Sequence, residues 1–390
     1  MNSSKLILVG GIIGLAFLIA LGLFLSDVKE KLIPDADFRV AFIGDQGLGQ
    51  SAIAVLNLIK DEGTHMVLHQ GDFDYGDNPN KWDKQISDVL GSDFPYFASA
   101  GNHDMKQWSG YQEKLYDRLE KNPDAVCNGD LGVKSSCTYN GLFFILAAPG
   151  IIGSDHESFI EKQLNDNDFM WRICSWHLDS LLGTATVSVP GDPYYAGWKV
   201  YEICKNGGAI IANAHVHTYH RTKTLIDIEN RNVDPEWSEP NKLRVKEGAT
   251  FVFDSSLGGV DLTDRGAANG ALFCTFNVGG QPNKAYCYFK NITGGIIDEF
   301  TITSFLETYP DTTNLIDVDM SGWDLTGYDF SNKVIIDTNL SNAVLVGADL
   351  SNAVLIGTTI IESDLTDANL AGVSLGYKDL TGTILTGANL

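Results

Sequence analysis

The fold is decided by a stretch near the N-terminus, Phe38-Arg-Val-Ala-Phe-Ile-Gly-Asp45-Gln-Gly. Its apolar part, from Phe38 to Gly44, is rich in aromatic and β-branched residues, which predicts a buried strand. Apolar residues at helical spacing follow over residues 50–60. A strand, a short polar turn and a helix in this order indicate an α/β fold.

The same alternation continues to about Thr303. Short apolar runs predict further strands, and amphipathic runs between them predict helices. We therefore expect an α/β sandwich over residues 38–303. The predicted strands are 66–70, 96–100, 142–148, 171–176 and 208–213, and the predicted helices are 82–90, 110–120, 156–166 and 198–205.

Polar blocks stand just beyond five of the predicted strands. Loops at the carboxyl ends of strands in an open α/β sheet converge on one crevice, so we expect these blocks to meet there. Carboxylate, phenol, amide and imidazole groups are all metal ligands. The blocks supply Asp45, Asp72, Tyr75, Asn102, His177, His215 and His217.

These side chains are enough for two metal ions. Two cations about 3.5–4 Å apart can clamp a phosphoryl group and lower the pKa of a bound water. Each block alone is equally typical of a turn or of a structural histidine, but their joint order predicts a metal centre. Asp72 is the expected bridge because its block is central. The first metal then takes Asp45, Tyr75 and His217, and the second takes Asn102, His177 and His215.

The blocks resemble those of the metallophosphoesterase (calcineurin-like) superfamily over roughly residues 38–303. Many members have Asp-x-His in the first block, whereas this chain has Asp45-Gln-Gly and offers Tyr75 three residues after the second aspartate. That variant is similar to the purple acid phosphatases. The run Ala-His-Val-His-Thr-Tyr-His-Arg at 214–221 resembles the last motif of the family.

The resemblance implies a dimetal hydrolase of phosphate monoesters that acts like an acid phosphatase. It implies Fe(III) at the tyrosine-containing site, where a hard phenolate ligand suits it, and Fe(II), Zn or Mn at the other. A metal-bound hydroxide would attack phosphorus in line, and His103 would contact the phosphate or assist the leaving group. The chain departs from the family at Ala214 and after His177, so a phosphodiesterase or nucleotidase on the same site stays open.

The last part of the chain has a different period. Sixteen successive positions, five residues apart from Leu315 to Leu390, are all apolar, and neither a helix nor a strand has that period. Residues 315–390 resemble a pentapeptide-repeat domain, which implies a right-handed β-helix with four pentapeptides to a turn. Self-association through this domain is expected. An alternative function follows: an adhesion or assembly protein whose phosphatase-like domain is not catalytic.

The N-terminus predicts a membrane anchor. Residues 6–25 are an unbroken apolar run about 30 Å long as a helix, which is enough to cross a bilayer. A cleaved signal peptide is the alternative. Residues 26–37 and 304–314 are the expected linkers. We therefore expect a membrane-anchored protein with its catalytic domain outside the cytoplasm, or a secreted protein after cleavage.

Charge and cysteines complete the prediction. A formal net charge of −23 argues against nucleic-acid binding, because a polyanion would be repelled. A small phosphorylated substrate must then be attracted by local cations. We predict disulfides at Cys127–Cys137 and Cys274–Cys287, with six reduced thiols as the alternative. Cys174 lies in an apolar run and is expected in the core.

Overall fold

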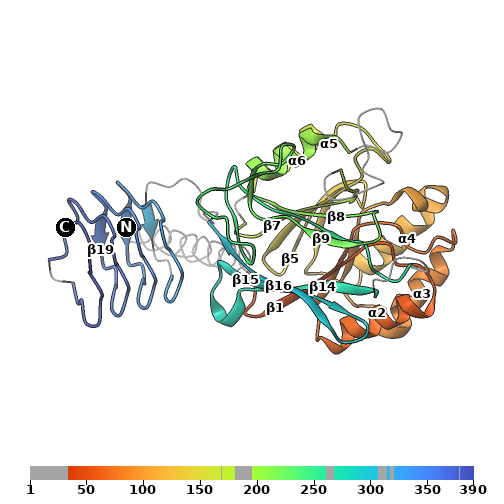
Figure 1. Cartoon of the computed structure of the whole chain (residues 1–390), viewed down its shortest axis with the longest axis horizontal. Coiled ribbons are helices and arrows are strands. Elements are labelled where there is room, and N and C mark those ends of the chain that lie inside the picture. Colours follow the sequence, from red (N-terminus) through yellow and green to blue (C-terminus); the bar gives the residue numbers. More distant parts are fainter. Residues whose placement is uncertain are drawn as a thin grey trace, which may run out of the picture.

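A computed structural model describes residues 34–167, 169–180, 196–260, 268–305, 314–316, 320–376 and 378–390. Two seven-stranded sheets with flanking helices form the larger part of it. A stack of short strands, blue in Figure 1, forms the C-terminal part. The predicted α/β sandwich is confirmed.

The first sheet, sheet A, carries the stretch that decided the fold. Its strand β1 pairs in parallel with β2 and antiparallel with β14, and β2 pairs in parallel with β3. Burial of apolar residues on both faces explains why these strands are almost continuously hydrophobic. In spatial order the strands are β12 (Lys242–Val245), β16 (Ile296–Ser304), β15 (Lys284–Asn291), β14 (Gly270–Phe276), β1 (Phe38–Ile43), β2 (Met66–His69) and β3 (Tyr96–Ala98).

The second sheet, sheet B, packs with sheet A around the interior. Its central strands β6, β7, β8 and β13 are parallel. The sequence predicted β6, β7 and β8 but none of its other strands. In spatial order they are β4 (Val126–Asp130), β5 (Lys134–Tyr139), β6 (Leu142–Ala147), β7 (Arg172–Leu178), β8 (Ile210–Ala214), β13 (Val252–Ser255) and β9 (Tyr219–Arg221). A separate hairpin pairs β10 (Leu225–Asp227) with β11 (Asn232–Val233).

The helices lie outside the two sheets (Figure 1). All predicted helices are present, with ends shifted by a few residues. The largest shift is at α3, which starts at Pro79 rather than at residue 82. The side chain of Asn78 accepts a hydrogen bond from Lys81 N, and proline suits the first turn of a helix. The helices are α2 (Gln50–Asp61), α3 (Pro79–Leu90), α4 (Trp108–Leu119), α5 (His156–Asn165) and α6 (Trp198–Asn206), with 3₁₀ turns η1 (Asn102–Gln107) and η2 (Val278–Gly280).

Disulfides join all six cysteines. The two predicted bonds, Cys127–Cys137 and Cys274–Cys287, are confirmed, and each links directly opposite residues of an antiparallel strand pair. The third bond, Cys174–Cys204, joins β7 to α6. Cys174 is in the core as expected, but its partner was missed because an apolar run does not indicate pairing across the fold.

The C-terminal repeats form stacked coils, and each coil contains twenty residues. The strands β17 (Asn314–Ile316), β18 (Val334–Ile336) and β19 (Val354–Ile356) pair in parallel, with Leu315 opposite Ile335 and Ile335 opposite Leu355. Twenty residues are four pentapeptides, as predicted. The central residues of the middle coils, such as Leu340 and Leu345, are fully buried.

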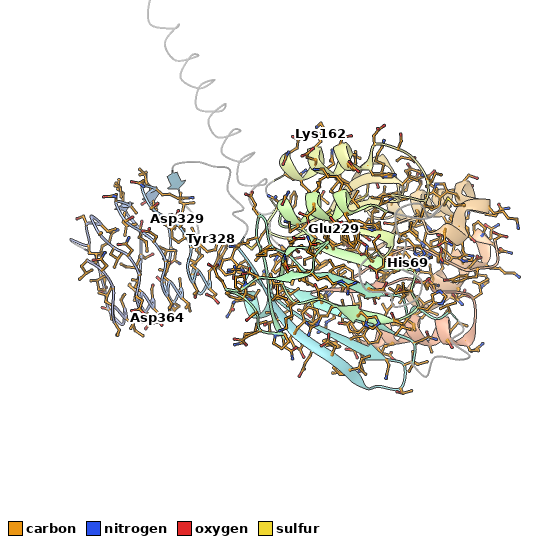
Figure 2. All side chains as sticks on the ribbon, turned by 45° about the horizontal axis from the view of Figure 1, so that its top comes forward. His69, Lys162, Glu229, Tyr328, Asp329 and Asp364 are labelled. Carbon is orange, nitrogen blue, oxygen red and sulfur yellow. A yellow bond between two sulfur atoms is a disulfide. The ribbon has the colours of Figure 1, made fainter. Side chains whose placement is uncertain are left out.

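The repeats contact the larger part directly. Lys284 of β15 forms an ion pair with Asp324, and the side-chain amide of Asn283 donates to Asp324 O. The rings of Phe305 and Tyr328 stack with their centroids 6.0 Å apart. Figure 2 places Tyr328 on the side of the stack that faces the two sheets.

The predicted anchor, residues 6–25, lies outside the described residues, as does most of the linkers 26–37 and 304–314. Among the residues that the structure describes, no helix is long and apolar enough to cross a bilayer.

Candidate metal centre

The predicted ligands come from both sheets. Sheet A supplies the oxygen ligands, which follow β1, β2 and β3, and sheet B supplies the three histidines, in and after β7 and β8. The structure therefore brings together side chains from five separate segments. The oxygen ligands are Asp45, Asp72, Tyr75 and Asn102, and the histidines are His177, His215 and His217.

His177 is not where the sequence placed it. It was expected beyond the end of a strand at 171–176, but β7 continues to Leu178 and includes it. The pairing of β7 with β8 shifts register between Ser175 and Leu178. At this irregularity the ring of His177 reaches across to sheet A, where its Nδ1 lies 2.8 Å from Gln70 O.

Three of the ligands form a first group. The hydroxyl of Tyr75 donates to Asp45 Oδ1 at 2.6 Å. His217 Nε2 lies 3.0 Å from the same hydroxyl and 3.1 Å from Asp45 Oδ1. An oxygen, a phenol and an imidazole nitrogen thus meet at one point.

A second group surrounds His177 Nε2. This nitrogen lies 3.0 Å from Asn102 Oδ1, 3.2 Å from Asp72 Oδ2 and 3.2 Å from His215 Nδ1. One ligand atom each from Asp72, His177 and His215 lies within 4.8 Å of the others. The charge of Asp72 also contributes to the raised pKa of the Tyr75 phenol, so Asp72 lies near both groups.

The hydrogen bond of His177 shows that the second group fits a cation. Gln70 O can only accept, so His177 Nδ1 is the N–H donor and, in the neutral ring, Nε2 presents a lone pair. That lone pair faces the carboxylate oxygen of Asp72. Two acceptors at this distance repel unless a proton or a metal ion lies between them. This is the hydrogen-bonding pattern of a metal-binding histidine.

The pKa of His177 reflects the same environment. Burial alone would lower it, but the charge of Asp72 and the hydrogen bond to it outweigh burial and raise the pKa of His177 to about 10. Its neighbour His215 moves the other way: burial and the charge of His177 lower the pKa of His215 to about 4. The carboxylates therefore attract one positive charge to the position of His177 Nε2.

Tyr75 needs a cation to ionise. Burial, followed by the charges of Asp45 and Asp72, raises the pKa of the Tyr75 phenol far above its ordinary value. Burial also raises the pKa of Asp45, but the hydrogen bond from His217 and the charges of His177 and His217 outweigh it, and the net shift is downward. A phenolate at this position is stable only when a cation replaces its proton.

The backbone at the centre is strained. Five of the seven predicted ligands have positive φ, between 52° and 83°: Asp45, Asp72, Tyr75, His215 and His217. Such conformations cost free energy in residues other than glycine and cluster at functional sites. No sequence pattern predicted them.

Two glycines allow the ligand loops to meet. A Cβ on Gly101 would lie 2.2 Å from Asp72 N and Oδ1, and one on Gly71 would lie 2.7 Å from Gly101 N. Gly71 also has a φ of +93°. The Asp72 loop and the Asn102 loop are therefore in backbone contact, which only glycine permits.

His103 lies beside the first group. Its backbone N–H donates to Asp72 Oδ1 at 2.9 Å, and its exposed ring lies 4.8 Å from the ring of Tyr75. The ring is thus at the open side of the centre, where a bound substrate could reach it.

Sequence reasoning missed two buried carboxylates here. Asp74 and Asp104 are 5% and 1% exposed, and each accepts backbone hydrogen bonds from the ligand loops. Both stand in the sequence blocks that supply Asp72, Tyr75 and Asn102, which read Gly-Asp-Phe-Asp-Tyr over residues 71–75 and Gly-Asn-His-Asp over residues 101–104. The additional aspartate in each motif is the sequence signal that could have indicated these two residues.

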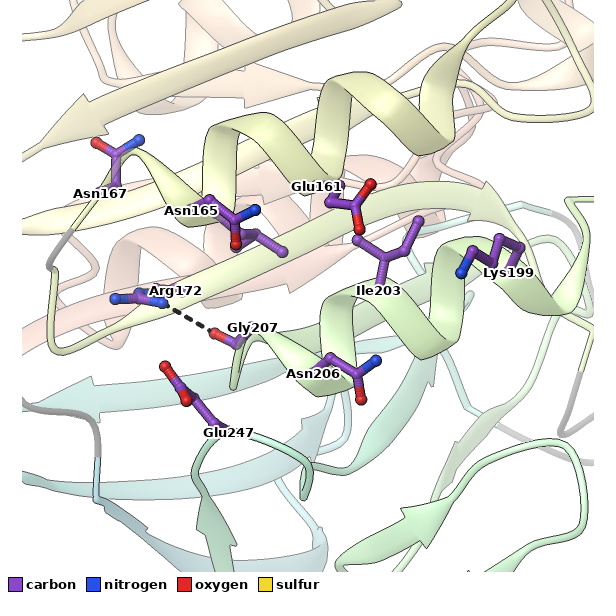
Figure 3. A pocket seen from close by; sticks show the side chains of 10 residues that line it. Glu161, Asn165, Asn167, Arg172, Lys199, Ile203, Asn206, Gly207 and Glu247 are labelled. Atoms are coloured by element: carbon purple, nitrogen blue, oxygen red, sulfur yellow. Dashed lines mark hydrogen bonds between the residues drawn. The ribbon is translucent and has the colours of Figure 1, made fainter.

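A separate pocket of about 270 Å³ lies between α5 and α6 (Figure 3). At its edge the guanidinium of Arg172 donates to Gly207 O, at the end of α6. None of the predicted site residues lines it. The metal centre and this pocket are therefore different places on the molecule.

Comparisons with known proteins agree with this geometry. Residues 38–219 match the family model of the calcineurin-like phosphoesterases, and residues 336–370 and 363–390 match that of the pentapeptide repeats. No curated protein matches the chain.

A solved structure resembles the larger part in fold. A purple acid phosphatase from yellow lupin (Lupinus luteus) seeds is 17% identical, with a TM-score of 0.54 over 72% of this chain. The chain covers 58% of that protein's length. HetL, a pentapeptide repeat protein of the cyanobacterium Nostoc, is 31% identical over 20% of this chain and 38% of its own, with a TM-score of 0.16.

The lupin enzyme shares the fold of the larger part at low sequence identity. The two family models support the assignment of each part, because each model matches the segment in which the sequence motifs or repeats of that family were found. The chain contains a calcineurin-like phosphoesterase domain over residues 38–219 and pentapeptide repeats at its C-terminal end.

Proposed function

We propose that the chain is a dimetal phosphomonoesterase of the acid phosphatase type. One observation carries the proposal: His177 Nε2 and the carboxylate of Asp72 face each other at 3.2 Å, with Asn102 and His215 around them. Only a positive charge between them makes this arrangement favourable. The neighbouring group of Asp45, Tyr75 and His217 supplies a second such position.

Two bound metal ions would neutralise the phosphate and supply a nucleophile at moderate pH. Asp72, which lies 3.2 Å from His177 Nε2 and acts on the Tyr75 phenol, would be the ligand shared by the two ions. Fe(III) is proposed beside Tyr75 because a phenolate is a hard, anionic ligand. Fe(II), Zn or Mn is proposed for the position held by Asn102, His177 and His215.

The protein's own residues hold and orient these ligands. Gln70 O fixes the ring of His177, and Asp45 Oδ2 accepts the backbone N–H of His215 at 3.0 Å. His103, exposed beside Tyr75, is the proposed contact for the phosphate or the leaving-group oxygen. In a chain with a net charge of −23, the site itself must attract the anionic substrate.

A phosphodiesterase or nucleotidase would use the same centre. The two reactions are separated by comparing hydrolysis of p-nitrophenyl phosphate with that of bis-p-nitrophenyl phosphate by the metal-loaded protein. We expect faster turnover of the monoester. Faster turnover of the diester would contradict the phosphomonoesterase proposal.

The repeat domain suggests a third function, assembly or adhesion without catalysis. Polar side chains on the described coils form ladders along the stack, such as Asn389 to Asn369 and Asn369 to Asp349. Self-association through these repeats is proposed as an additional property. Protein that binds a partner but stays inactive after loading with iron and zinc or manganese would favour this third function.

For location we propose an anchor at residues 6–25 and a catalytic domain outside the cytoplasm. Three disulfides support an oxidising compartment. Protease treatment of intact cells tests this. The proposal predicts that added protease degrades the catalytic domain while the membrane is still sealed.

A further inference from the structure

Two buried acids lie against the metal centre without belonging to the predicted ligand set. Asp74 and Asp104 are almost completely buried. Burying a carboxylate costs free energy unless hydrogen bonds or charges compensate it. The partners of these two groups therefore indicate why they are there.

Asp104 joins two ligand loops. Its Oδ2 accepts the backbone N–H of Asp72 at 3.0 Å and that of Gly101 at 2.7 Å, and its Oδ1 accepts the N–H of Phe73 at 2.8 Å. Asp72 belongs to the loop after β2, and Gly101 directly precedes Asn102 in the loop after β3. One carboxylate thus sets the distance between the proposed bridging ligand and an amide ligand of the second metal.

Asp74 shapes the turn that carries Tyr75. Its Oδ1 accepts the backbone N–H of Gly76, and its Oδ2 accepts that of Asn78, both at 2.8 Å. The hydroxyl of Tyr111 in α4 also donates to Oδ1. These bonds close around Tyr75, whose φ is +53°. A strained residue of this kind persists only where its surroundings hold it.

We propose that Asp74 and Asp104 are positioning residues that hold the Asp72–Tyr75 loop in the geometry that two metal ions require. Asp104 fixes the end of the loop at Asp72, and Asp74 fixes the end at Tyr75. The inference rests on the proposed function, because it takes Asp72, Tyr75 and Asn102 as metal ligands. Residues that support ligands in this way typically change metal affinity 10- to 100-fold when they are replaced.

A purely structural role is the competing explanation, and it needs a matched control. Asp234 is also buried, accepts the backbone N–H of Glu236 at 3.0 Å, and pairs with Arg244. It lies just after β11, and within the described part of the chain its side chain forms no hydrogen bond to a ligand loop. Asp234→Asn therefore measures what the loss of a buried, hydrogen-bonded carboxylate does to the protein in general.

The experiment is a Zn²⁺ titration of the full chain and of Asp104→Asn, Asp74→Asn and Asp234→Asn, followed by calorimetry, with zinc per chain counted after gel filtration. Asparagine keeps the shape but turns an N–H toward a backbone N–H. We expect Asp104→Asn and Asp74→Asn each to weaken one of the two zinc-binding steps about 10- to 100-fold. Asp234→Asn should bind zinc as the unchanged protein does, even if its melting temperature falls.

Two results would overturn the proposal: wild-type zinc affinity in both Asp74→Asn and Asp104→Asn, or an equal loss in Asp234→Asn. If Asp104→Asn does not fold, Asp74→Asn decides alone by the same criteria. A failure of the proposed function would look different. The unchanged protein would bind two zinc ions and hydrolyse no phosphate ester, while the zinc affinities of the variants could still fall as expected.

Discussion

Residues in the left-handed backbone conformation occur in both parts of the molecule, but they differ in kind. In the metal centre they include Asp72, Tyr75 and His215, which lie in or beside the interior. In the repeats they include Asn342 and Asn352, which are exposed and recur at turns. The same strained conformation therefore gathers at the candidate site in one part and repeats along a regular architecture in the other.

Residue type accounts for part of the difference, because asparagines occur among the positive-φ residues of the repeats and a tyrosine and two histidines among those of the centre. Asparagine adopts positive φ at little cost, so a turn of the β-helix can repeat it without compensation. Tyrosine does so rarely, and the hydrogen bonds of Asp74 must hold it. Backbone strain indicates a functional site only where the strained residues are buried and several of their side chains lie close together.

The largest expected effect is at the bridging carboxylate. Asp72→Asn removes a carboxylate charge that lies beside His177 and acts on the Tyr75 phenol, so we expect phosphatase activity to fall by about 10³-fold or more, beyond the 10- to 100-fold typical of supporting residues. Asp349→Asn in the repeats, also an aspartate that accepts hydrogen bonds, is the control and should keep full activity. Equal activity in both variants would show that activity does not depend on the charge of Asp72.

The next effect concerns the repeats. Leu345 is fully buried in the stack, and Leu345→Ala leaves a cavity that costs about 2–5 kcal/mol of the free energy of unfolding. Equilibrium unfolding in denaturant should show the lower stability of the variant. An assay of phosphatase activity should show an unchanged kcat. Val354→Ala, at a side chain 47% exposed on the outside of the same stack, should cost little. A large fall in kcat for Leu345→Ala would show that the two parts are not independent.

Tyr75 tests the identity of the first metal. A phenolate bound to Fe(III) should give the protein a visible charge-transfer band. In Fe(III)-loaded protein, Tyr75→Phe should abolish this band and weaken iron binding, because no other phenol reaches Asp45 and His217 among the described residues. Tyr286→Phe, which loses only a hydrogen bond to Glu299, should keep the band. A band that survives in Tyr75→Phe shows that this residue is not an iron ligand.

The smallest effect is at the contact between the two parts. Burial raises the pKa of Asp324, but the hydrogen bonds from Lys284 and Thr326 and the charge of Lys284 outweigh it, so the pKa falls below the usual 3.8. A lowered pKa means that this contact stabilises the protein above pH 3.8 and stops doing so as the pH falls through the lowered value. The contribution is about 1 kcal/mol or less, because the pair is partly exposed.

Melting temperatures of the unchanged protein and of Asp324→Asn, measured from pH 7 to pH 2, check this prediction. Their difference should be constant near neutral pH and should disappear in acid. A difference in melting temperature that grows as the pH falls would contradict a lowered pKa of Asp324.

The sequence was sufficient to predict the elements that follow from a regular spacing of apolar residues. Strands such as Phe38–Ile43 and the five-residue repeat from Leu315 follow directly from the spacing of apolar residues, and both were confirmed. It was also sufficient to expect the ligand blocks in one place, because parallel strands end at one edge. The roles of those residues as metal ligands remain a prediction.

What the sequence could not supply depends on contacts across the fold. The position of His177 inside β7 follows from a register shift against β8, and the Cys174–Cys204 bond follows from packing of α6 on that strand. The roles of Asp74 and Asp104 appear only once their backbone partners are known. None of these has a periodic signal.

The most direct test of the central claim is the number of metal ions bound per chain. Elemental analysis of the purified, catalytically active protein should give two metal ions per chain, one of them iron, and Asp72→Asn should hold at most one. Two ions still bound tightly by Asp72→Asn, or an active protein that contains none, would contradict a dimetal centre bridged by Asp72.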